Sequence, residues 1–251
     1  MIHFVGAGPG ATDLITLRGA KLLSEADIII YAGSLVNPEL LKMAKESCKI
    51  YNSASMTLDE VVEVFLDAEA KGLTTVRLHT GDPSIYGAIR EQMDKLKEND
   101  ISYDVTPGVS SFCAAAAAAQ VEYTLPSISQ TVIITRMEGR TPVPPKEKLA
   151  LLASHQASMV LFLSTGLLKE SCEALIEGGY APDTKTTMVY KASWPEQKII
   201  RATIETLPAI AEKEGIKNTA LILVGNFLGD EYELSKLYDS GFSHMFREAK
   251  A

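Results

Sequence analysis

Short apolar runs alternate with longer segments of mixed polarity through the first 120 residues of the chain. Residues 2–5 and 26–31 are nearly continuous apolar runs, as expected for strands that a parallel sheet buries on both faces. The segments between such runs predict helices over residues 14–24, 38–45 and 57–71. Regular alternation of strand and helix favours a parallel sheet with helices packed on its faces.

Capping residues indicate where the helices begin. Thr57 and Glu60 form the capping-box pattern, in which Thr is the cap and Glu stands three positions later. Thr12 or Asp13 is expected to cap the first helix of the chain. A further helix is expected to begin near Ser84, after a Gly-Asp-Pro turn, and to continue to about residue 98.

The second half of the chain has a different rhythm, because some of its strands follow one another without a helix between them. Helices are expected over residues 146–153, 169–177 and 207–213, and this order of elements suggests a mixed sheet. The charged tail from about residue 229 is interpreted as a solvated helical end that carries aromatic residues available for docking. The expected strands cover residues 131–135, 159–163, 187–190, 198–203 and 220–224.

Composition limits the class of protein. The 251 residues are 46% hydrophobic and 22% charged, which allows one large α/β domain or two small ones. A formal net charge of -8, without a block of Lys and Arg, argues against a nucleic-acid partner. The three cysteines form no CxxC pair, so neither a disulfide framework nor a zinc site is expected.

We expect a cytoplasmic protein that has no membrane partner. An odd and small number of cysteines fits a reducing compartment. The chain enters a strand at once, without the basic and apolar regions of a signal peptide. Its longest apolar run, residues 112–119, is too short to span a bilayer.

Loops of small residues directly follow four of the expected strands, at residues 6–10, 80–83, 107–111 and 164–166. Parallel strands end at the same edge of a sheet, and open α/β sheets bind their ligands at that edge. Each loop could also be no more than a tight turn. Four such loops together favour a shared ligand site over four unrelated turns.

The first loop invites a dinucleotide-binding interpretation, because Gly6, Gly8 and Ala11 match G-x-G-x-x-A. That fingerprint needs an acidic residue at the end of the second strand, and none stands at residues 31–33. Pro9 also removes an N–H where a pyrophosphate would need a donor. A Rossmann oxidoreductase is therefore disfavoured, and no Lys follows the glycines as in a P-loop.

Two other kinds of site are also disfavoured. The four histidines lie far apart in the sequence, with no H-x-x-x-H pair and no adjacent acidic ligands, so a metal site is not expected. Ser110 and Ser111 lack the G-x-S-x-G elbow that presents a hydrolase nucleophile.

The loops and the residues around them resemble the tetrapyrrole (corrin/porphyrin) methyltransferase family. The resemblance covers nearly the whole chain. The motifs on which it rests are Val-Gly-Ala-Gly-Pro-Gly at residues 5–10, Asp-Leu-Ile-Thr-Leu-Arg at 13–18, Thr-Gly-Asp-Pro-Ser-Ile-Tyr-Gly at 80–87 and Pro-Gly-Val-Ser-Ser at 107–111. More narrowly, residues 31–36, 52–57 and 235–238 resemble the family members that methylate C11 of precorrin-4 in cobalamin biosynthesis.

The resemblance implies an α/β fold of two domains, with a ligand cleft between them and a homodimeric assembly. The expected limits are residues 1–120 for an N-terminal domain with a mostly parallel sheet and 121–251 for a C-terminal domain with a mixed sheet. It further implies a methyltransferase that uses S-adenosylmethionine, releases S-adenosylhomocysteine and acts on a small tetrapyrrole.

Site residues follow from the resemblance position by position. Leu163 and Ser164 stand where relatives often have Met before Gly, which leaves that contact open. The expected donor-binding residues are Pro9, Thr80, Gly81, Asp82, Ile85, Ser110, Ser111, Leu163, Ser164, Ala192 and Ala220.

The acceptor of such an enzyme carries several carboxylates, so local cations must offset the net charge of -8. No triad or metal is required, because a sulfonium is already activated and alignment can provide much of the acceleration. Asp13 is a further acceptor-site candidate; Asp13 and Asp104 are also the candidates for taking a proton, although a cap or surface role suits both. The candidate cations are Arg18, Arg77, Arg136 and Lys191.

Several alternatives stay open. Methylation could occur at another position of the ring, with uroporphyrinogen III or another precorrin as acceptor, or on the diphthamide precursor of a protein. A non-catalytic ligand-binding module is the alternative from a different class. The sequence does not distinguish a cobalt-containing acceptor from a metal-free one, and a cobalt-first route is preferred.

Overall fold

The computed structural model describes residues 1–249, except for the side chain of Ser34. The chain packs into two compact units. Unit 1 contains Met1–Ala115 together with Lys191–Gln197, and unit 2 contains Ala116–Tyr190 and the chain from Lys198 onwards. The expected domain limits at residues 120 and 121 stay a prediction.

Unit 1 is built on a five-stranded sheet in the order β3-β2-β4-β1-β5, and every neighbouring pair is parallel. This confirms the parallel sheet that the alternating pattern predicts. The central strand β4 is buried along its whole length. The strands are β1 (Ile2–Gly6), β2 (Ile28–Tyr31), β3 (Lys49–Asn52), β4 (Thr75–His79) and β5 (Tyr103–Thr106).

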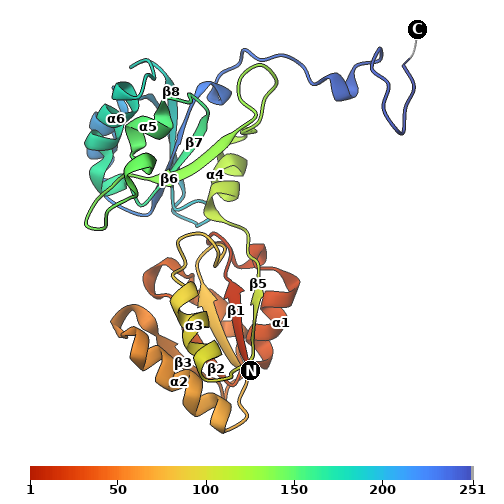
Figure 1. Cartoon of the computed structure of the whole chain (residues 1–251), viewed down its shortest axis with the longest axis vertical. Coiled ribbons are helices and arrows are strands. Elements are labelled where there is room, and N and C mark those ends of the chain that lie inside the picture. Colours follow the sequence, from red (N-terminus) through yellow and green to blue (C-terminus); the bar gives the residue numbers. More distant parts are fainter. Residues whose placement is uncertain (250–251) are drawn as a thin grey trace. The chain divides into compact units, whose positions relative to one another are not determined.

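Helices cover both faces of this sheet, as Figure 1 shows. Phe4 and Ile30 pack toward α2 and α3, whereas Val5 and Ile29 pack toward α1. Successive residues of one strand therefore enter different cores, which explains the continuous apolar runs. The helices are α1 (Leu17–Glu25), α2 (Leu58–Ala70) and α3 (Arg90–Glu98).

Side-chain caps fix the starts of two of these helices. Thr57 Oγ1 accepts a hydrogen bond from the N–H of Glu60, and Glu60 Oε2 accepts one from the N–H of Thr57, which confirms the capping box. The cap of α1 is Thr16, whose Oγ1 accepts the N–H of Gly19 at 3.0 Å. The prediction of a cap at Thr12 or Asp13 is wrong, because these residues form a separate 3₁₀ turn.

The start predicted for α3 is also wrong. The helix begins at Arg90 and not at Ser84. Tyr86 and Ala88 have positive φ angles of 56° and 48°, a conformation that a right-handed helix cannot contain. The residues between the Gly-Asp-Pro turn and Arg90 therefore form a turn and an irregular loop that follow β4.

Unit 2 contains a mixed five-stranded sheet in the order β6-β7-β10-β8-β9. Strands β6 and β7 are parallel, and the other pairs are antiparallel. The mixed sheet expected from consecutive strands is confirmed. The strands are β6 (Val132–Arg136), β7 (Ser158–Phe162), β8 (Lys185–Tyr190), β9 (Lys198–Thr203) and β10 (Ala220–Val224).

One apolar core fills the space between the sheet of unit 2 and its helices. Met159, Met188 and Ile222 point from the strands into this core, where they meet Leu175 of α6. Among the described residues, no helix is long and apolar enough to cross a membrane. The helices are α5 (Leu149–Ala153), α6 (Leu168–Glu177) and α7 (Leu207–Lys213), and α4 (Ser111–Ala119) carries the chain from unit 1 into unit 2.

Short 3₁₀ helices join these elements, and one of them stands where residues 38–45 predict a helix. They are η1 (Thr12–Leu14), η2 (Gly33–Leu35), η3 (Pro38–Met43), η4 (Ser53–Ser55), η5 (Pro145–Glu147), η6 (Thr165–Leu167), η7 (Asn226–Leu228) and η8 (Lys236–Tyr238).

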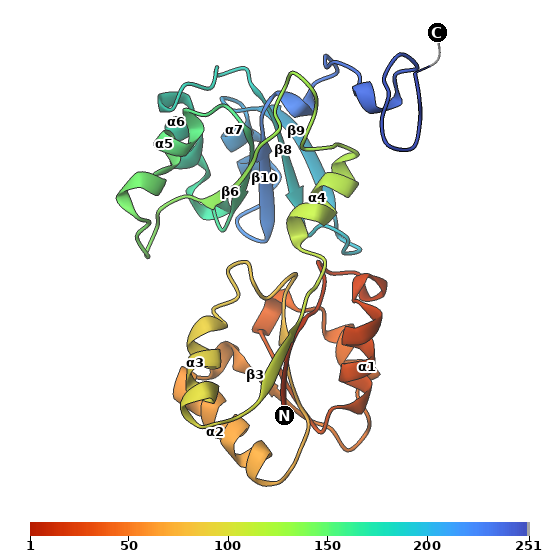
Figure 2. The ribbon, with the colours of Figure 1, turned by 45° about the vertical axis from the view of Figure 1, so that its right-hand side comes forward.

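The chain ends in a C-terminal arm, by which we mean residues 232–249. Only the three residues of η8 are helical here, so the prediction of a helical end is wrong. Figures 1 and 2 show the arm in blue, running away from the sheet of unit 2 in both views. Arg247 organises it, because its Nη2 donates hydrogen bonds to the carbonyls of Leu237, Asp239 and Phe242.

Candidate active site

The loops after β1 and β4 are joined at the carboxyl edge of the parallel sheet. Gly81 donates its N–H to the carbonyl of Gly8 at 2.8 Å, and Gly8 donates to the carbonyl of Gly81 at 3.3 Å. Both glycines have positive φ angles, 78° for Gly8 and 62° for Gly81. Residues with a side chain rarely adopt this conformation, so the join depends on glycine at both positions.

The loop after β5 enters the same contact. A Cβ placed on Gly108 would lie 2.1 Å from the carbonyl oxygen of Gly81 and 2.7 Å from the Cα of Gly6. These are backbone atoms, which cannot move aside as a flexible side chain can. Three strand ends are therefore packed backbone against backbone, and this part of the edge is rigid.

Asp82 adds a charged contact between two of the loops. Its Oδ2 accepts the N–H of Gly108 at 2.9 Å, and its Oδ1 accepts the N–H of Ser84 at 2.8 Å. Partial burial alone would raise the pKa of this carboxyl, but the hydrogen bonds from Ser84 and Gly108 outweigh burial and lower its pKa. The carboxylate is therefore charged at neutral pH.

Three hydroxyl groups lie on the same loops. Thr80 follows β4, Ser110 is buried, and Ser111 opens α4. A Cβ on Gly81 would meet the backbone of Ser110 and Ser111 at 3.5 Å, which shows how close the loops are. None of the three hydroxyls has a hydrogen-bond partner among residues 1–249, so all three can bind a ligand. Ile85, half-buried beside them, adds an apolar surface.

The segment Lys191–Gln197 covers the first glycine loop, although it lies between two strands of unit 2 in sequence. Trp194 Nε1 donates to the carbonyl of Pro9 at 3.0 Å, and the N–H of Ala11 donates to Ser193 Oγ at 3.0 Å. Ala192 is buried in the same segment. Pro9 and Ala192 thus join Thr80, Gly81, Asp82, Ile85, Ser110 and Ser111 in unit 1.

Sequence reasoning missed Trp194 and Ser193. Trp194 is the only tryptophan of the chain, which could have marked it. A Cβ on Gly10 would lie 2.1 Å from its ring, so the indole occupies the space that a glycine leaves free. Sequence spacing alone could not reveal this contact, because Gly10 and Trp194 are far apart in the chain.

Arg77 and His79 lie on β4 behind the glycine loops. Arg77 is 6% exposed, donates from Nε to Gln92 Oε1 at 2.9 Å and donates from Nη1 to the carbonyl of Ile30 at 3.1 Å. The prediction of Arg77 as a cation for the acceptor is wrong, because the side chain points into the core. Burial lowers its pKa to about 10, so it stays charged at neutral pH.

His79 is buried beside Arg77, and its Nε2 has no hydrogen-bond partner among the described residues. Its ring lies 6.1 Å from that of Phe4. Burial, followed by the charge of Arg77, lowers its pKa to about 3. The imidazole is therefore neutral at physiological pH.

Unit 2 carries the remaining predicted residues along one edge of its sheet. Strands β6 and β7 end at this edge and β10 begins there. Ser164 is fully buried, where its Oγ accepts the N–H of Met137 at 2.8 Å and donates to the carbonyl of Phe162 at 2.7 Å. The carbonyl of Ala220 accepts a hydrogen bond from Thr165 Oγ1 at 3.1 Å. Only backbone groups of Ser164 are thus left for a ligand.

Leu163 is a conformational outlier at the end of β7. Its φ angle is 54°, and the side chain is 65% exposed. A non-glycine residue in this region costs about 1 kcal/mol or more, and such strain is common at ligand sites. Arg136 lies on the same edge and donates three hydrogen bonds to carbonyls of residues 137–142.

Two candidates for the acceptor site are open to solvent in unit 1. Asp13 and Arg18 are exposed, and neither has an ion pair with any residue in the described part of the chain. Lys191 Nζ lies 3.7 Å from Glu196 and 5.3 Å from the centre of the Trp194 ring. The cation above Trp194 therefore stands near the first glycine loop.

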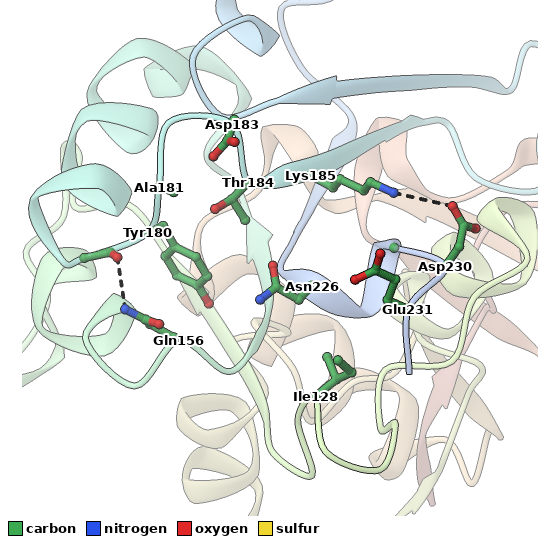
Figure 3. Close-up of a pocket in the computed structure, with 12 residues that line it drawn as sticks. Ile128, Gln156, Tyr180, Ala181, Asp183, Thr184, Lys185, Asn226, Asp230 and Glu231 are labelled. Atoms are coloured by element: carbon green, nitrogen blue, oxygen red, sulfur yellow. Dashed lines mark hydrogen bonds and ion pairs between the residues drawn. The ribbon is translucent and has the colours of Figure 1, made fainter. Parts of the chain in front are cut away.

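A cavity of about 680 Å³ in unit 2 does not contain the predicted residues. Figure 3 shows it among Gln156, Tyr180, Lys185 and Asp230. The strands β7 and β8 begin near this cavity and β10 ends there, so it lies at the opposite edge of the sheet from Ser164. Within residues 1–249, no cluster of His, Cys, Asp or Glu could hold a metal ion.

Comparison with known proteins identifies relatives that match nearly the whole chain. A cobalt-precorrin-4 C(11)-methyltransferase of Methanocaldococcus jannaschii is 53% identical over 249 residues, covering 99% of this chain and 96% of the relative. A precorrin-4 C(11)-methyltransferase of Sinorhizobium sp is 40% identical and covers 98% of both chains.

Solved structures agree with these relatives. The X-ray structure of a cobalamin biosynthetic enzyme, cobalt precorrin-4 methyltransferase, has a TM-score of 0.89 and 46% identity, covering 91% of this chain and 95% of that one. A uroporphyrin-III C-methyltransferase from Thermus thermophilus, in complex with S-adenosylhomocysteine, has a TM-score of 0.73, covers 90% and 92%, and at 24% identity supports the fold alone.

The family profile gives the same result and confirms the resemblance read from the glycine loops. The profile of the tetrapyrrole (corrin/porphyrin) methylases matches residues 1–208, which include the glycine loops of unit 1 and the Lys191–Gln197 segment. The chain belongs to the tetrapyrrole (corrin/porphyrin) methylase family.

Proposed function

We propose that the chain transfers the methyl group of S-adenosylmethionine to C11 of cobalt-precorrin-4, giving cobalt-precorrin-5 in cobalamin biosynthesis. The observation that carries this proposal is the 53% identity, over 99% of the chain, to a relative that bears this activity in its name. Relatives whose names mention precorrin-4 and no cobalt are less similar, at 40% and 42% identity, which favours the cobalt-containing acceptor.

The residues at the edge of the parallel sheet fit S-adenosylmethionine. The donor carries an ammonium, a carboxylate and ribose hydroxyls, so it needs both hydrogen-bond donors and acceptors. Thr80, Ser110 and Ser111 offer hydroxyls that can act as either. Oδ2 of Asp82 can accept a second hydrogen bond beyond that from Gly108, whereas Oδ1 already accepts both the N–H and the hydroxyl of Ser84. Leu163, Ser164 and Ala220 remain proposed contacts from unit 2.

The chain needs to do little chemistry of its own in such a reaction. The donor, when bound, supplies a methyl group that is already activated by the sulfonium. The rigid backbone contact of Gly6, Gly81 and Gly108 can hold one reactant in a fixed orientation, and alignment of this kind can provide much of the acceleration. The neutral His79 lies buried behind these loops, so we assign it no proton transfer.

The acceptor carries carboxylates, and Arg18 is the cation that we propose to bind one of them. Its side chain is exposed and makes no ion pair with the described residues, so its charge is free for a ligand. Arg136 and Asp13 are the weaker candidates, since the guanidinium of Arg136 is already bonded to its own loop.

We further propose a homodimer in the cytoplasm. The three cysteines form no disulfide in the structure, and Cys113 is exposed as a free thiol, which suits a reducing compartment. The homodimer is the assembly that the family resemblance implies.

The test is mass spectrometry of the product after incubation with S-adenosylmethionine and an early corrinoid, in cobalt-loaded and metal-free forms in parallel. Addition of a single methyl to cobalt-precorrin-4 is the expected result. Preference for the metal-free form would mean that precorrin-4 without cobalt is the acceptor. Binding of the donor without transfer to either acceptor would contradict the proposal.

Replacement of Arg18 by Ala should weaken acceptor binding about tenfold, because one charged contact to a carboxylate is lost. Affinity for S-adenosylhomocysteine, measured by calorimetry, should stay the same. Lys21→Ala is the matched control, since Lys21 is an exposed cation of the same helix that lies 3.8 Å from Glu25. Equal KM values for the acceptor in both variants would remove Arg18 from the site.

A further inference from the structure

Arg77 is a buried cation that forms no ion pair with any residue in the described part of the chain. A buried charge is costly unless polar groups surround it, so an apolar residue would be the cheaper choice at this place in the sheet. Its hydrogen bonds lead from β4 to the carbonyl of Ile30 on β2 and to Gln92 on α3, which covers one face of the sheet (Figure 1). The presence of the charge therefore calls for a reason beyond packing.

Gln92 connects Arg77 to the backbone just before α3. Its Oε1 accepts a hydrogen bond from Arg77 Nε at 2.9 Å, and its Nε2 donates one to the carbonyl of Ala88 at 3.0 Å. Gln92 is itself only 5% exposed. A guanidinium can donate hydrogen bonds but cannot accept them, so the amide oxygen of Gln92 must face Arg77. The NH2 group is thereby turned toward Ala88, and the charge of Arg77 sets the orientation of the amide.

The carbonyl that Gln92 binds belongs to a strained stretch of backbone. Tyr86 and Ala88 have φ angles of 56° and 48°. Residues with a side chain keep this conformation only where the surrounding structure holds them in it. Gly87, between them, packs against an earlier part of the same stretch, since a Cβ there would lie 2.1 Å from the carbonyl oxygen of Pro83. The positions of Ala88 and Pro83 are therefore coupled.

The same stretch carries two of the predicted donor-binding residues, Asp82 and Ile85, and we call residues 82–88 the donor loop. The N–H of Ile85 donates to the carbonyl of Asp82 at 3.3 Å, and the carboxylate of Asp82 is bonded to Gly108. The donor loop is thus fixed at its start by Asp82 and at its end by Gln92. Binding residues keep their geometry only when supporting side chains hold them. Loss of the second attachment should therefore displace Ile85.

We propose that Gln92, oriented by Arg77, is a positioning residue of the donor site, which holds the donor loop in the conformation that binds S-adenosylmethionine. The inference rests on the donor of the proposed function. Gln92 acts through the backbone of Ala88, and Arg77 acts through Gln92, so neither side chain touches a reactant.

Two variants separate the bond to the donor loop from the bond to Arg77. Gln92→Glu keeps an oxygen for Arg77 but has no donor for the carbonyl of Ala88, whereas Gln92→Met removes both bonds. We expect the Kd for S-adenosylhomocysteine, measured by calorimetry on the full chain, to rise about tenfold in both variants. Gln92→Met should unfold at a lower urea concentration than Gln92→Glu, because it leaves the charge of Arg77 without that partner.

The relation between affinity and stability distinguishes a positioning role from a merely structural one. Equal loss of affinity in two variants of unequal stability is the expected result. Affinity that follows stability instead, with Gln92→Glu binding as tightly as the unchanged chain, would overturn the proposal.

Asp27→Ala is the matched control for a weakened sheet. Asp27 Oδ2 accepts the N–H of Thr74 at 2.8 Å, directly before β4, and its Oδ1 is bonded to Lys45. The substitution therefore weakens the same strand at its other end, away from the donor loop. Stability should fall while the affinity for S-adenosylhomocysteine stays the same. A loss of affinity equal to that of Gln92→Glu would assign the effect to general loosening of unit 1 and overturn the proposal.

A second substitution tests whether Gln92 acts on the backbone of the donor loop. Glycine adopts positive φ angles without steric cost, so Ala88→Gly relieves strain that the bond from Gln92 otherwise holds. Introduced together with Gln92→Glu, it should restore most of the lost affinity. A double variant that binds no better than Gln92→Glu would contradict the proposed route through Ala88.

Hydrogen exchange examines the donor loop without any ligand. The N–H groups of Ser84 and Ile85 are bonded to Asp82, so their exchange reports opening of the donor loop. Exchange should be about tenfold faster in Gln92→Glu and unchanged in Asp27→Ala. Equal exchange in Gln92→Glu and the unchanged chain would overturn the proposal. If the unchanged chain fails to bind S-adenosylhomocysteine, the donor of the proposed function is wrong, and hydrogen exchange still decides whether Gln92 holds the loop.

Discussion

The two sheets differ in how they hold together the loops that carry the predicted site residues. In unit 1, Gly6, Gly81 and Gly108 bring three loops into direct backbone contact. In unit 2, hydrogen bonds from hydroxyl side chains connect the loops instead. Ser164 Oγ accepts the N–H of Met137, and Thr165 Oγ1 donates to the carbonyl of Ala220. The first arrangement depends on the absence of side chains and the second on their presence. The two edges should therefore respond differently to the same kind of substitution.

The two units also differ in the polar residues that they bury. Unit 1 buries the ionisable Arg77 and His79 on its central strand, together with Gln92. In unit 2, the buried polar residues of the described chain are all Ser or Thr. Ser and Thr hydroxyls take up no proton as the pH falls, whereas His79, with a pKa of about 3 when folded, takes one up below its ordinary pKa of 6.5 once the chain unfolds. Acid should therefore weaken unit 1 before it weakens unit 2.

The largest effect is expected from Gly108→Ala. The new methyl group would meet the carbonyl of Gly81 at 2.1 Å, so the loops must separate. We expect a loss of about 3 kcal/mol in the free energy of unfolding, at the upper end of overpacking costs, and loss of donor binding. Urea unfolding and calorimetry with S-adenosylhomocysteine measure both.

Gly166→Ala is the control in unit 2, because its Cβ would have no neighbour closer than 3.9 Å. The stability of this variant should change little. If the two variants unfold at the same urea concentration, the backbone contact in unit 1 is not what holds its loops.

The second effect concerns pH and His79. Its folded-state pKa of about 3 lies below the ordinary value of 6.5, so below pH 6.5 the unfolded chain takes up a proton that the folded chain refuses. Stability should fall by up to about 1.4 kcal/mol per pH unit between these two values. Hydrogen exchange at pH 7 and pH 4.5 should show unit 1 opening first.

His79→Asn removes this titration and should flatten the pH profile of unfolding. His155→Asn is the matched control, because His155 is exposed on unit 2 and should leave the profile unchanged. An unaltered slope in His79→Asn would assign the acid sensitivity to other groups.

Ser164→Ala tests the hydroxyl contacts of unit 2. It leaves the partly buried N–H of Met137 without its partner at 2.8 Å, which should cost about 1 kcal/mol. Thermal unfolding followed by circular dichroism gives the change. Affinity for S-adenosylhomocysteine should fall less than in Gly108→Ala, and a larger fall would mean that the unit 2 edge dominates donor binding.

The smallest effect is expected from Trp194→Phe, which removes one hydrogen bond to Pro9 and retains most of the ring. A loss of about 1 kcal/mol should result. Because Trp194 is the only tryptophan, its fluorescence in the unchanged chain reports on the first glycine loop. Addition of S-adenosylhomocysteine should shift that emission. A constant spectrum at saturation would mean that the segment Lys191–Gln197 takes no part in donor binding.

The sequence predicted unit 1 well because its signals are local. The glycine loops and the capping box at Thr57 lie within a few residues of the features they form. The start of α3 was missed because a Pro after Gly-Asp suits a first helical turn, whereas Tyr86 and Ala88 adopt left-handed conformations that no propensity indicates.

The predictions that failed, or that sequence could not supply, depend on distant contacts. Arg77 is a candidate cation for the acceptor by its position in the chain, and only the structure shows that its side chain is buried against Gln92. The indole of Trp194 meets Gly10 across most of the chain length. The assignment of Leu163, Ser164 and Ala220 to the donor stays a prediction.

The place of Lys191–Gln197 in the chain has a consequence for synthesis. Residues 1–115 leave the ribosome as a nearly complete parallel sheet, but the indole that bonds to Pro9 arrives only after the strands up to Tyr190 have been made. At roughly 5–20 residues per second, this delay is on the order of ten seconds. The nascent chain thus passes through a stage in which the glycine loops of unit 1 exist without the Trp194 contact that covers the first of them.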